Sequence, residues 1–473
     1  MPVDLNSPLA WKTATGDAAA MLKQLQPNIL KAHVRDHLQV LFLQFKDGPE
    51  ARTFLKALTG KMKSAKKHLD EMEAFKTSGT PGTAYVGVGL TFEGYKKLGI
   101  PVGSIPGNGS AGPFKDSMRS DVSVTALGDP PVSAWEETFR HTIHAVVLIG
   151  DADPAAVTAR RAEIDALVTP KIKLLGVEKG RSQVNARGDG IEHFGYIDGR
   201  SQPLFLVEDV ETERHTMDGT SVWDPAFGLG RVLVADSAAP NSAQQFGSFF
   251  VFRKLEQNVR LFRTAEQDLA DKLALTGEDR KRAGAMIVGR FRDGTPVAVQ
   301  RANGGHTPIM NDFDYDSDDL AGKCPFHGHI RKTNPRGSGG FEAQENERRH
   351  LMVRRGQTYG KRTDNPTDES LPLSSRPTKD VGLLFMAFNS EIENQFQFTQ
   401  QTWVDNPGFP KVPAGAAAPG LDQVIGQGTR PKATSAKTWG GDQSPPVAAA
   451  PQAVTMKGGE YFFMPSLAFL KSL

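Results

Sequence analysis

Two histidines in a basic stretch, His327 and His329, are the side chains of this chain best suited to bind a metal. They lie two positions apart, so they would share a face of a strand but point in roughly opposite directions on a helix. Cys324 precedes them, but it is the only Cys among the 473 residues. Structural zinc requires four nitrogen or sulfur ligands, with Cys usually in pairs, so the sequence argues against zinc.

A haem iron has simpler requirements, because one protein ligand suffices and that ligand is commonly a His. The haem propionates also need cations and amide donors nearby. His329 is followed closely by such groups, namely Arg331, Lys332, Asn334 and Arg336. Taken alone, a basic run of this kind is more commonly a solvated surface.

A second motif far upstream places an acid between glycines, in the segment FGYIDGRSQP at residues 194–203. Together with HIRKTNPR at 329–336 and RRGQTYG at 354–360, it resembles the dye-decolorizing peroxidase family. Further segments in the order of the family extend the resemblance over most of the chain, among them LQPNILKAH, LGDPP, MIVGRFRDGTP, FMAFNSEIENQFQFTQQTW and GGEYFFMPS.

The resemblance implies a haem b peroxidase that reduces hydrogen peroxide through a ferryl intermediate and oxidises dyes, phenols and other aromatic reductants. It also implies an α+β fold of the dimeric α+β barrel type, with two ferredoxin-like domains whose antiparallel sheets are covered by helices. We expect an N-terminal domain over residues 1–200 and a mainly haem-binding domain over 201–473. A haem-handling or iron-releasing protein on the same scaffold, and a non-enzymatic α+β binding module, are the alternatives.

By motif position, the resemblance makes His329 the axial iron ligand, with His327 as the alternative to be checked. Asp198 then corresponds to the distal acid and Arg354 to the distal cation, while Arg331 adds to the cofactor-binding groups. A single base that becomes an acid suffices to move a proton between the two oxygens of peroxide, and a guanidinium suits the negative charge on the departing oxygen. Taken alone, Asp198 would be an ordinary Asp-Gly turn residue.

The resemblance also places Leu383 and Phe385 along the peroxide pocket. The second nitrogen of the axial imidazole needs a partner, for which we predict Glu391, with Glu393 on the same helix as the alternative. Bulky dyes would not reach such a pocket, so electrons would have to travel from the surface. Tyr359 is a candidate relay for them, and a packing aromatic is the equally weighted alternative.

Composition excludes several other classes of protein. With 56 basic and 54 acidic residues, the chain has a net charge of +2, which gives no field for recruiting nucleic acid or an anionic membrane. No apolar run approaches the roughly 18 residues of a membrane-spanning helix. The first residues lack a signal-peptide pattern, so we expect a cytoplasmic location by default, the mature form of a secreted protein being the alternative. Oligomeric state is not indicated.

The elements that must position these residues follow an alternating pattern typical of ferredoxin-like units. In the first half, apolar runs predict strands at 38–45, 84–90, 141–151 and 171–177, with helices after Pro49 and after Asp153-Pro154. In the second half we expect strands at 248–252, 381–388 and 460–464 and helices at 255–275 and 391–403. Residues 406–452, rich in Pro, Ala and Gly, predict a long irregular excursion.

Overall fold

The computed structural model describes residues 2–107, 112–414, 416, 418–444 and 446–473. Its strands are β1 (His37–Phe45), β2 (Tyr85–Leu90), β3 (Ala145–Asp151), β4 (Ile172–Arg181), β5 (Gln183–Val184), β6 (Gly190–Ile191), β7 (Val234–Ala235), β8 (Phe246–Gln257), β9 (Val353–Arg354), β10 (Gln357–Tyr359), β11 (Gly382–Asn389) and β12 (Val454–Met464).

Most of these strands form one antiparallel sheet that closes on itself. In the N-terminal half the strand order is β4-β1-β3-β2, the order of a ferredoxin-like unit, and β12-β8-β11-β10 repeats this order in the C-terminal half. Two seams join the halves, where Leu90 pairs with Phe463 and Gly180 pairs with Tyr359. The predicted α+β fold with two ferredoxin-like units is therefore confirmed, and the two sheets share one barrel.

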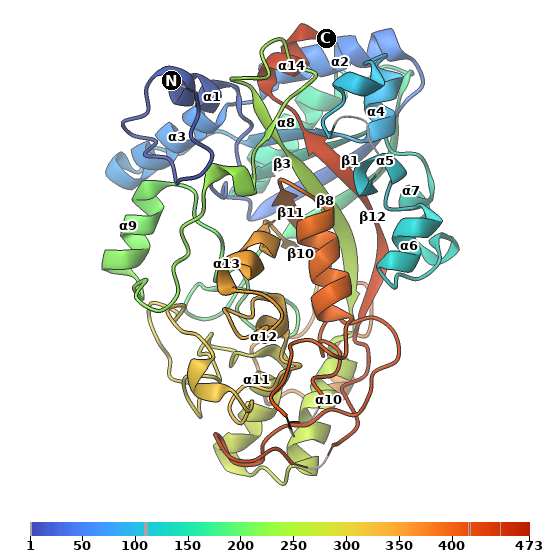
Figure 1. The fold of residues 1–473 in the computed structure, drawn as a ribbon. Helices are drawn as coiled ribbons and strands as arrows, with labels where there is room; N and C mark the ends of the chain where they lie inside the picture. The colour runs from blue at the N-terminus through green and yellow to red at the C-terminus, as the bar shows by residue number, and fades with distance from the viewer. Residues whose placement is uncertain (1, 108–111, 415, 417, 445) are drawn as a thin grey trace.

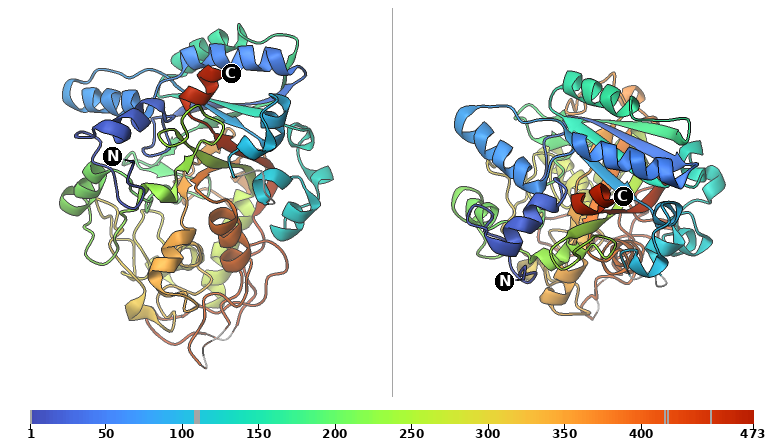
Figure 2. Two further views of the ribbon diagram at one scale, coloured as in Figure 1. Left: turned by 45° about the horizontal axis from the view of Figure 1, so that its top comes forward. Right: turned by 90° about the horizontal axis from the view of Figure 1, so that it is seen from above.

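Helices surround the strands on several sides (Figure 1; Figure 2). In Figure 1, α2 and α14 lie at the upper end, whereas α10, α11 and α12 lie at the lower end. The helices are α1 (Gly16–Gln24), α2 (Gly48–Leu58), α3 (Ala65–Ser78), α4 (Phe92–Lys97), α5 (Pro113–Asp116), α6 (Asp121–Ala126), α7 (Glu137–Arg140), α8 (Pro154–Asp165), α9 (Val207–Thr216), α10 (Val259–Lys272), α11 (Lys281–Val288), α12 (His329–Thr333), α13 (Gln344–Glu347) and α14 (Leu467–Ser472).

Local signals explain where the helices of the first half begin. The carboxylate of Asp47 accepts a hydrogen bond from Glu50 N at 2.9 Å at the start of α2. In the same way, Asp153 accepts one from Ala155 N at 2.8 Å before Pro154 opens α8. Such caps satisfy backbone N–H groups that have no partner within the helix. Both predicted helices are confirmed.

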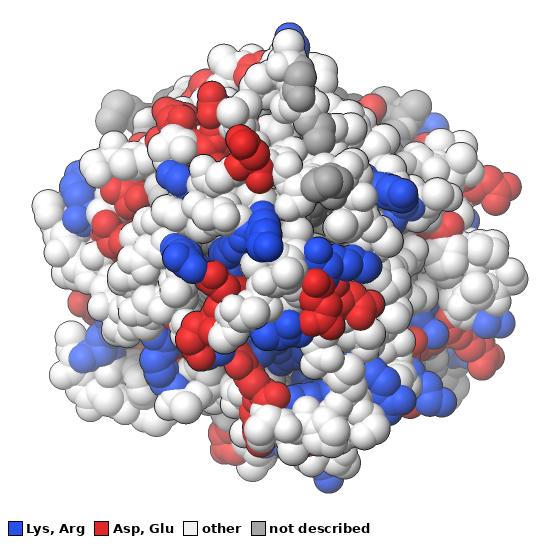
Figure 3. Space-filling model, turned by 90° about the horizontal axis from the view of Figure 1, so that it is seen from below, with Lys and Arg blue, Asp and Glu red and all other residues white. Residues whose placement is uncertain are grey.

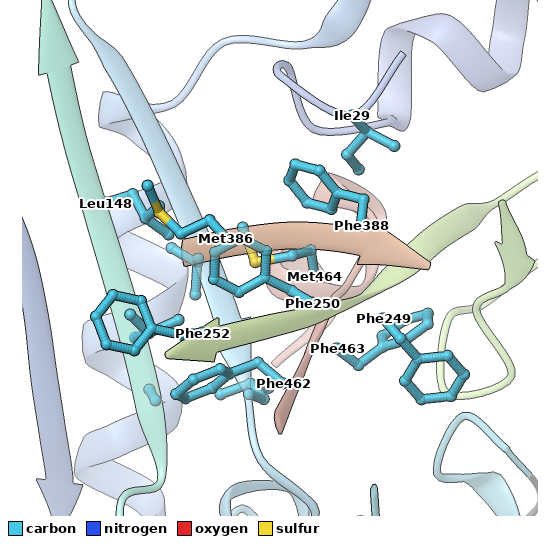
Figure 4. Packing of buried hydrophobic residues seen from close by; sticks show 14 of the residues in the cluster. Ile29, Leu148, Phe249, Phe250, Phe252, Met386, Phe388, Phe462, Phe463 and Met464 are labelled. Carbon is cyan, nitrogen blue, oxygen red and sulfur yellow. The ribbon is translucent and has the colours of Figure 1, made fainter. Parts of the chain in front are cut away.

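An aromatic core holds the strands of the second half together (Figure 4). The ring of Phe250 on β8 lies 5.1 Å from that of Phe388 on β11, and Phe249 lies 5.2 Å from Phe463 on β12. Phe252 reaches across to Phe42 of β1 at 4.9 Å. Burying each such ring stabilises the fold by roughly 1.5–3 kcal/mol, so β8, β11 and β12 form a rigid support for residues on the other face of β11.

The segment after β11 differs from its predicted form. The sequence predicts a helix at 391–403, and the chain is helical there but forms the wider turns of a π-helix over η9 (Glu393–Gln397) and η10 (Thr399–Val404). Phe396, Thr399 and Gln400 of this segment line the main cavity. Such wide turns are rare and occur frequently at functional sites.

The predicted excursion at 406–452 forms turns and isolated bridges such as Ala433 with Val447 over its described residues, while residues 415, 417 and 445 lie outside them. The predicted domain boundary near residue 200 stays a prediction.

Seen from below, the surface of the molecule carries basic and acidic side chains that are interspersed with one another (Figure 3). Of the helices in the described ranges, none combines the length and the apolar character needed to cross a membrane.

Candidate active site

A cavity of about 250 Å³ is lined by residues 192–203 together with residues of the C-terminal half of the chain. Its lining includes side chains from residues 192–203, from α12, from the π-helical segment and from residues 424–427. Strand β11 contributes Leu383 and Phe385. His329, Asp198, Arg354, Leu383 and Phe385, which the sequence singles out, all line this one cavity. The tertiary structure therefore brings together residues that lie up to 187 positions apart, from 198 to 385.

His329 opens α12, and its imidazole is backed by a carboxylate. Its Nδ1 lies 2.8 Å from Oδ2 of Asp422. The Asp422 side chain is fully buried, whereas 23% of the His329 side chain remains accessible, and this surface faces the cavity that His329 lines. Because Asp422 fixes the proton on Nδ1, the lone pair of Nε2 is left for a metal.

The electrostatics of this pair favour charge on both partners. Burial alone would lower the pKa of His329, but attraction to Asp422 and the hydrogen bond between them raise the pKa above its ordinary value. For Asp422, burial would raise the pKa, but His329 and hydrogen bonds from Ile425 N and Val424 N lower it instead. Asp422 thus remains a carboxylate that increases the electron donation of the imidazole.

His327 points away from the cavity. Its side chain is 3% exposed and lies beside a small separate cavity near Gln423. Burial lowers the pKa of His327 to about 4, so it remains a neutral core group. Since Gly328 is the N-cap of α12, the two histidines leave the backbone in different directions, and only His329 reaches the main cavity.

Asp198 and Arg354 form an ion pair on the cavity wall. Oδ1 of Asp198 lies 3.3 Å from Nη1 of Arg354 and also accepts a hydrogen bond from Gly199 N at 2.7 Å. Gly199 adopts a φ of +88°, which explains why glycine follows the acid in this turn. Arg354 is held further by its backbone N–H, which donates to Gln202 Oε1 at 3.0 Å.

The apolar part of the wall comes from the alternation of β11. Leu383 and Phe385 face the cavity and are half-buried, whereas Leu384 and Met386 between and after them are fully buried in the core. Successive side chains of a strand point to opposite faces, so the same strand supports the core and lines the site. Leu383 and Phe385 lie where the resemblance places them.

Two buried cations give the cavity a positive lining. Arg290 and Arg336 donate hydrogen bonds to backbone carbonyl groups, Arg290 to Met310 O at 2.6 Å and Arg336 to Asn311 O at 2.6 Å. In the described part of the chain neither has an acidic side chain within ion-pair distance. Burial, with repulsion from Arg336, lowers the pKa of Arg290 to about 9, and burial lowers that of Arg336 to about 10. Buried positive charge of this kind is suited to an anionic ligand.

The prediction that Arg331 binds the cofactor is wrong. Its guanidinium donates to Asp318 Oδ2 at 3.0 Å and to Cys324 O at 2.7 Å, and it lies between the rings of Tyr315 and Phe326. Arg331 is 1% exposed and does not belong to the cavity lining. It therefore holds the loop before α12 in place, while Arg336 of the same motif reaches the cavity.

The prediction that Glu391 supports the imidazole is also wrong. Glu391 is exposed and accepts a hydrogen bond from Asn394, and the alternative, Glu393, is exposed as well. The partner is Asp422, which lies 93 positions from His329 in the irregular excursion. Oδ1 of Asp422 also accepts hydrogen bonds from Val424 N and Ile425 N. The local sequence could therefore indicate Asp422 as the residue of an Asx-turn, but not as the partner of His329.

Tyr359 lies behind the cavity wall rather than in it. Its ring is 7% exposed, and Nζ of Lys254 lies 4.9 Å from the ring centroid. Burial raises the pKa of Tyr359 above its ordinary value. Of the segment at 354–360, Arg354 and Gly356 line the cavity, whereas Tyr359 does not.

Haem fits this donor set. One imidazole with a carboxylate behind it is a common haem ligand arrangement, and the buried cations Arg290 and Arg336 suit two propionates. Over the described residues, by contrast, the structure has no group of three or more His, Cys, Asp or Glu side chains that could hold a metal by protein ligands alone.

Comparison with known proteins agrees with this geometry. The family described as the DyP dimeric alpha+beta barrel domain matches residues 24–183. The chain is similar to the multifunctional dye peroxidase DyP2 of Amycolatopsis sp., with 59% identity over 100% of both chains, and the solved structure of DyP2 matches with a TM-score of 0.96.

Two further relatives extend the comparison. The structure of a DyP-type peroxidase of Anabaena sp. matches 98% of this chain and 97% of its own at 37% identity and a TM-score of 0.90. Peroxidase 2 of Mycetinis scorodonius is 33% identical over 73% of this chain and 69% of its own. With relatives that match it from end to end, and with His329, Asp198 and Arg354 around one cavity, the chain belongs to the dye-decolorizing peroxidase family.

Proposed function

We propose that this protein binds haem b in the cavity beside His329 and reduces hydrogen peroxide there, with dyes, phenols and other aromatic compounds as electron donors. The proposal rests on one cavity with two features in its lining. One is the imidazole of His329, which is paired with a carboxylate, and the other is the ion pair of Asp198 with Arg354. The similarity to DyP2 of Amycolatopsis sp., named a multifunctional dye peroxidase, supports the same reaction.

The residues of the cavity divide between holding the cofactor and handling peroxide. His329 Nε2 would hold the iron, and Arg290 and Arg336 would bind the propionates. Bound haem supplies the electrons and the iron site for cleavage of the peroxide oxygen–oxygen bond.

Asp198 and Arg354 carry out the proton and charge steps. The Asp198 carboxylate takes a proton from one oxygen of peroxide and returns it to the departing oxygen. The Arg354 guanidinium, always charged, stabilises the negative charge that develops on the departing oxygen. Leu383 and Phe385 exclude water and bulky donors, which strengthens both interactions.

Two measurements test the proposal. An absorption spectrum of the purified protein with an imidazole-ligated Soret band is expected, and its absence after loading with haem would support a binding module without cofactor. Rapid mixing of the loaded protein with hydrogen peroxide should then change the Soret band within a single turnover. A haem-handling protein would bind haem but show no turnover of peroxide with an aromatic donor.

Asp422→Asn is expected to weaken haem binding and activity by roughly 10- to 100-fold, because partners of a ligating imidazole have effects of this size. Asn can no longer carry the negative charge that increases the basicity of His329. The reduction potential of the bound iron should therefore rise, a change that a loss of packing alone would not produce. Spectroelectrochemical titration measures this potential.

Asp405→Asn is the matched control, because Asp405 is also a largely buried acid of the same region but contacts Gln400 and Gln427 instead of His329. Burial raises the pKa of Asp405 to about 6. The control should leave the reduction potential unchanged. An unchanged potential in Asp422→Asn as well would remove Asp422 from the proximal role.

Tyr359→Phe is expected to leave the turnover of bulky dyes unchanged. Oxidation of a phenol requires an acceptor for its proton, and among the described residues no side chain accepts a hydrogen bond from the hydroxyl group of Tyr359. The ring itself packs in the core and survives the substitution. Steady-state oxidation of a bulky dye measures the effect, and a selective loss of dye turnover would instead establish Tyr359 as a relay.

A further inference from the structure

His33 lies outside the main cavity, and a lysine holds its imidazole in the neutral form. Nζ of Lys63 lies 2.9 Å from Nε2 of His33. An ammonium group can only donate, so Nε2 must accept and the proton of the neutral ring must lie on Nδ1. Nδ1 accordingly donates to the carbonyl oxygen of Val34 at 2.7 Å. A proton on Nε2 would set two donors and two positive charges against each other.

Lys63 cannot turn away from His33 without leaving a network of contacts. Its side chain is 6% exposed, and its ammonium group also donates to Oε2 of Glu71 at 2.5 Å and to the carbonyl oxygen of Thr83. Together with His33, these acceptors use all three of its N–H groups. The contact between Lys63 and His33 is therefore fixed by the surrounding structure.

Two further rings pack on the imidazole of His33. Its centroid lies 4.6 Å from that of His68 on α3 and 5.6 Å from that of Tyr85 on β2, and both pairs are stacked. Burial lowers the pKa of His68 to about 2 and raises the pKa of Tyr85 to about 12. Both of these rings therefore stay uncharged in weakly acid solution.

The surroundings of His33 oppose a second proton on its ring. Burial, followed by the charge of Lys63, lowers the pKa of His33 from 6.5 to about 4, and Arg35 also lowers it, whereas the contact with Val34 and the charge of Asp151 raise it. Between these two values the unfolded state binds more protons than the folded state. The stability that His33 contributes is therefore complete above pH 6.5 and is lost as the pH falls toward 4.

The loop that carries His33 holds Arg355, the residue that follows Arg354. The backbone N–H of His33 donates to Asn28 Oδ1 at 3.0 Å, and its carbonyl oxygen accepts from Arg35 Nε at 3.1 Å. The carbonyl oxygen of Asn28 in turn accepts from Arg355 Nε at 2.9 Å. Arg35 Nη1 donates to the carbonyl oxygen of Arg355, also at 2.9 Å. His33 thus connects two of the residues that hold Arg355.

The position of Arg355 determines that of Arg354. Arg355 is 6% exposed, and its guanidinium also donates to Ile29 O at 3.1 Å, so it is bound to the loop at several points. Successive side chains of an extended chain point in opposite directions. Arg355 accordingly contacts the loop at 28–35, whereas Arg354 lines the main cavity.

We propose that His33 is a positioning residue for Arg354 and that its neutral form sustains the reaction with peroxide in acid solution. The inference rests on the proposed peroxidase function and adds a pH-dependent control of the same site. A proton on His33 would separate it from Lys63 and release the loop at 28–35. Arg355 would lose partners in that loop, and Arg354 would no longer be held beside Asp198.

His33→Gln tests this role, because Oε1 of Gln can accept from Lys63 while its amide does not titrate. The rate at which the haem-loaded variant reacts with hydrogen peroxide is divided by that of the parent at each pH from 7 to 4. Protonation of Asp198 affects both proteins and cancels in this ratio. We expect the ratio to rise by about twofold at pH 4, where half of His33 is protonated in the parent. A ratio that does not change with pH would overturn the positioning role.

Thermal unfolding gives a readout that needs no catalysis. Between pH 6.5 and pH 4, the melting temperature of the haem-loaded parent should fall more steeply than that of His33→Gln. A second variant, His33→Phe, keeps a stacked ring that cannot take a proton and should show the same shallower slope. If both variants have the slope of the parent, His33 is not the group that titrates and the inference is overturned.

His141→Gln is the control, because His141 belongs to the same half of the chain but lies beside an acid, with Nε2 3.8 Å from Glu137 Oε1. Its rate ratio and its slope should match those of the parent. If the parent does not react with peroxide at all, the proposed peroxidase function fails, and the melting temperatures still test the titration of His33. If the parent reacts but its rate ratio to His33→Gln is constant, only the control by His33 fails.

Discussion

Replacing His329 with Ala is expected to remove imidazole-ligated haem from the purified protein and, with it, peroxidase activity. The imidazole of His329 lines the main cavity and is paired with the buried carboxylate of Asp422, and Ala offers iron no donor atom. The loss should be close to complete, since the axial ligand is removed rather than adjusted. Haem content per chain and the position of the Soret band measure the result.

His327→Gln serves as the control for this experiment. His327 is 3% exposed and lies outside the main cavity, and Gln keeps a polar side chain of similar size. The control should retain the Soret band of the parent. Retention of an imidazole-type spectrum by His329→Ala, with its loss in His327→Gln, would transfer the ligand role to His327.

Asp198→Asn is expected to slow the reaction with hydrogen peroxide by about 10²- to 10⁴-fold, which is the usual contribution of a positioned general acid–base. Asn has nearly the shape of Asp and retains the carbonyl oxygen that accepts from Gly199 N, so the turn should persist. Haem should remain bound because Asp198 does not contact His329. Stopped-flow absorbance at the Soret band measures the rate.

Asp189→Asn is the matched control, since Asp189 pairs with Arg187 at 3.0 Å and is 26% exposed, close to the 37% of Asp198. It lies upstream of the cavity-lining segment and should react like the parent. Arg354→Leu should also slow the reaction, because no fixed positive charge would remain beside the departing oxygen. Reaction of Asp198→Asn at the parent rate would pass the proton role to Arg354 with water.

The sequence alone determined most of the regular structure around this site. Continuous apolar runs marked β1, β2, β3 and β11 to within a few residues, since strands buried on both faces need no polar alternation. Asp153 before Pro154 located the start of α8 through a local cap. These signals act over a few neighbouring residues, and the sequence therefore contains them in full.

The sequence also identified His329, Asp198 and Arg354, because each lies in a contiguous motif that resembles the family. The choice between His329 and His327 remained open at that level, since it depends on the direction in which α12 begins at Gly328. The same geometry determines which Arg of the motif lines the cavity. Arg331 binds Asp318, whereas Arg336 reaches the cavity.

Only the tertiary structure supplied the partner of the imidazole and the closure of the barrel. Asp422 lies 93 residues from His329 in a stretch without periodicity, so no local pattern could pair them, and the sequence favours the exposed Glu391 instead. The seam between β4 and β10 rests on a single pair, Gly180 with Tyr359. Long-range contacts of this kind arise from how complete elements pack, which a reading of neighbouring residues does not contain.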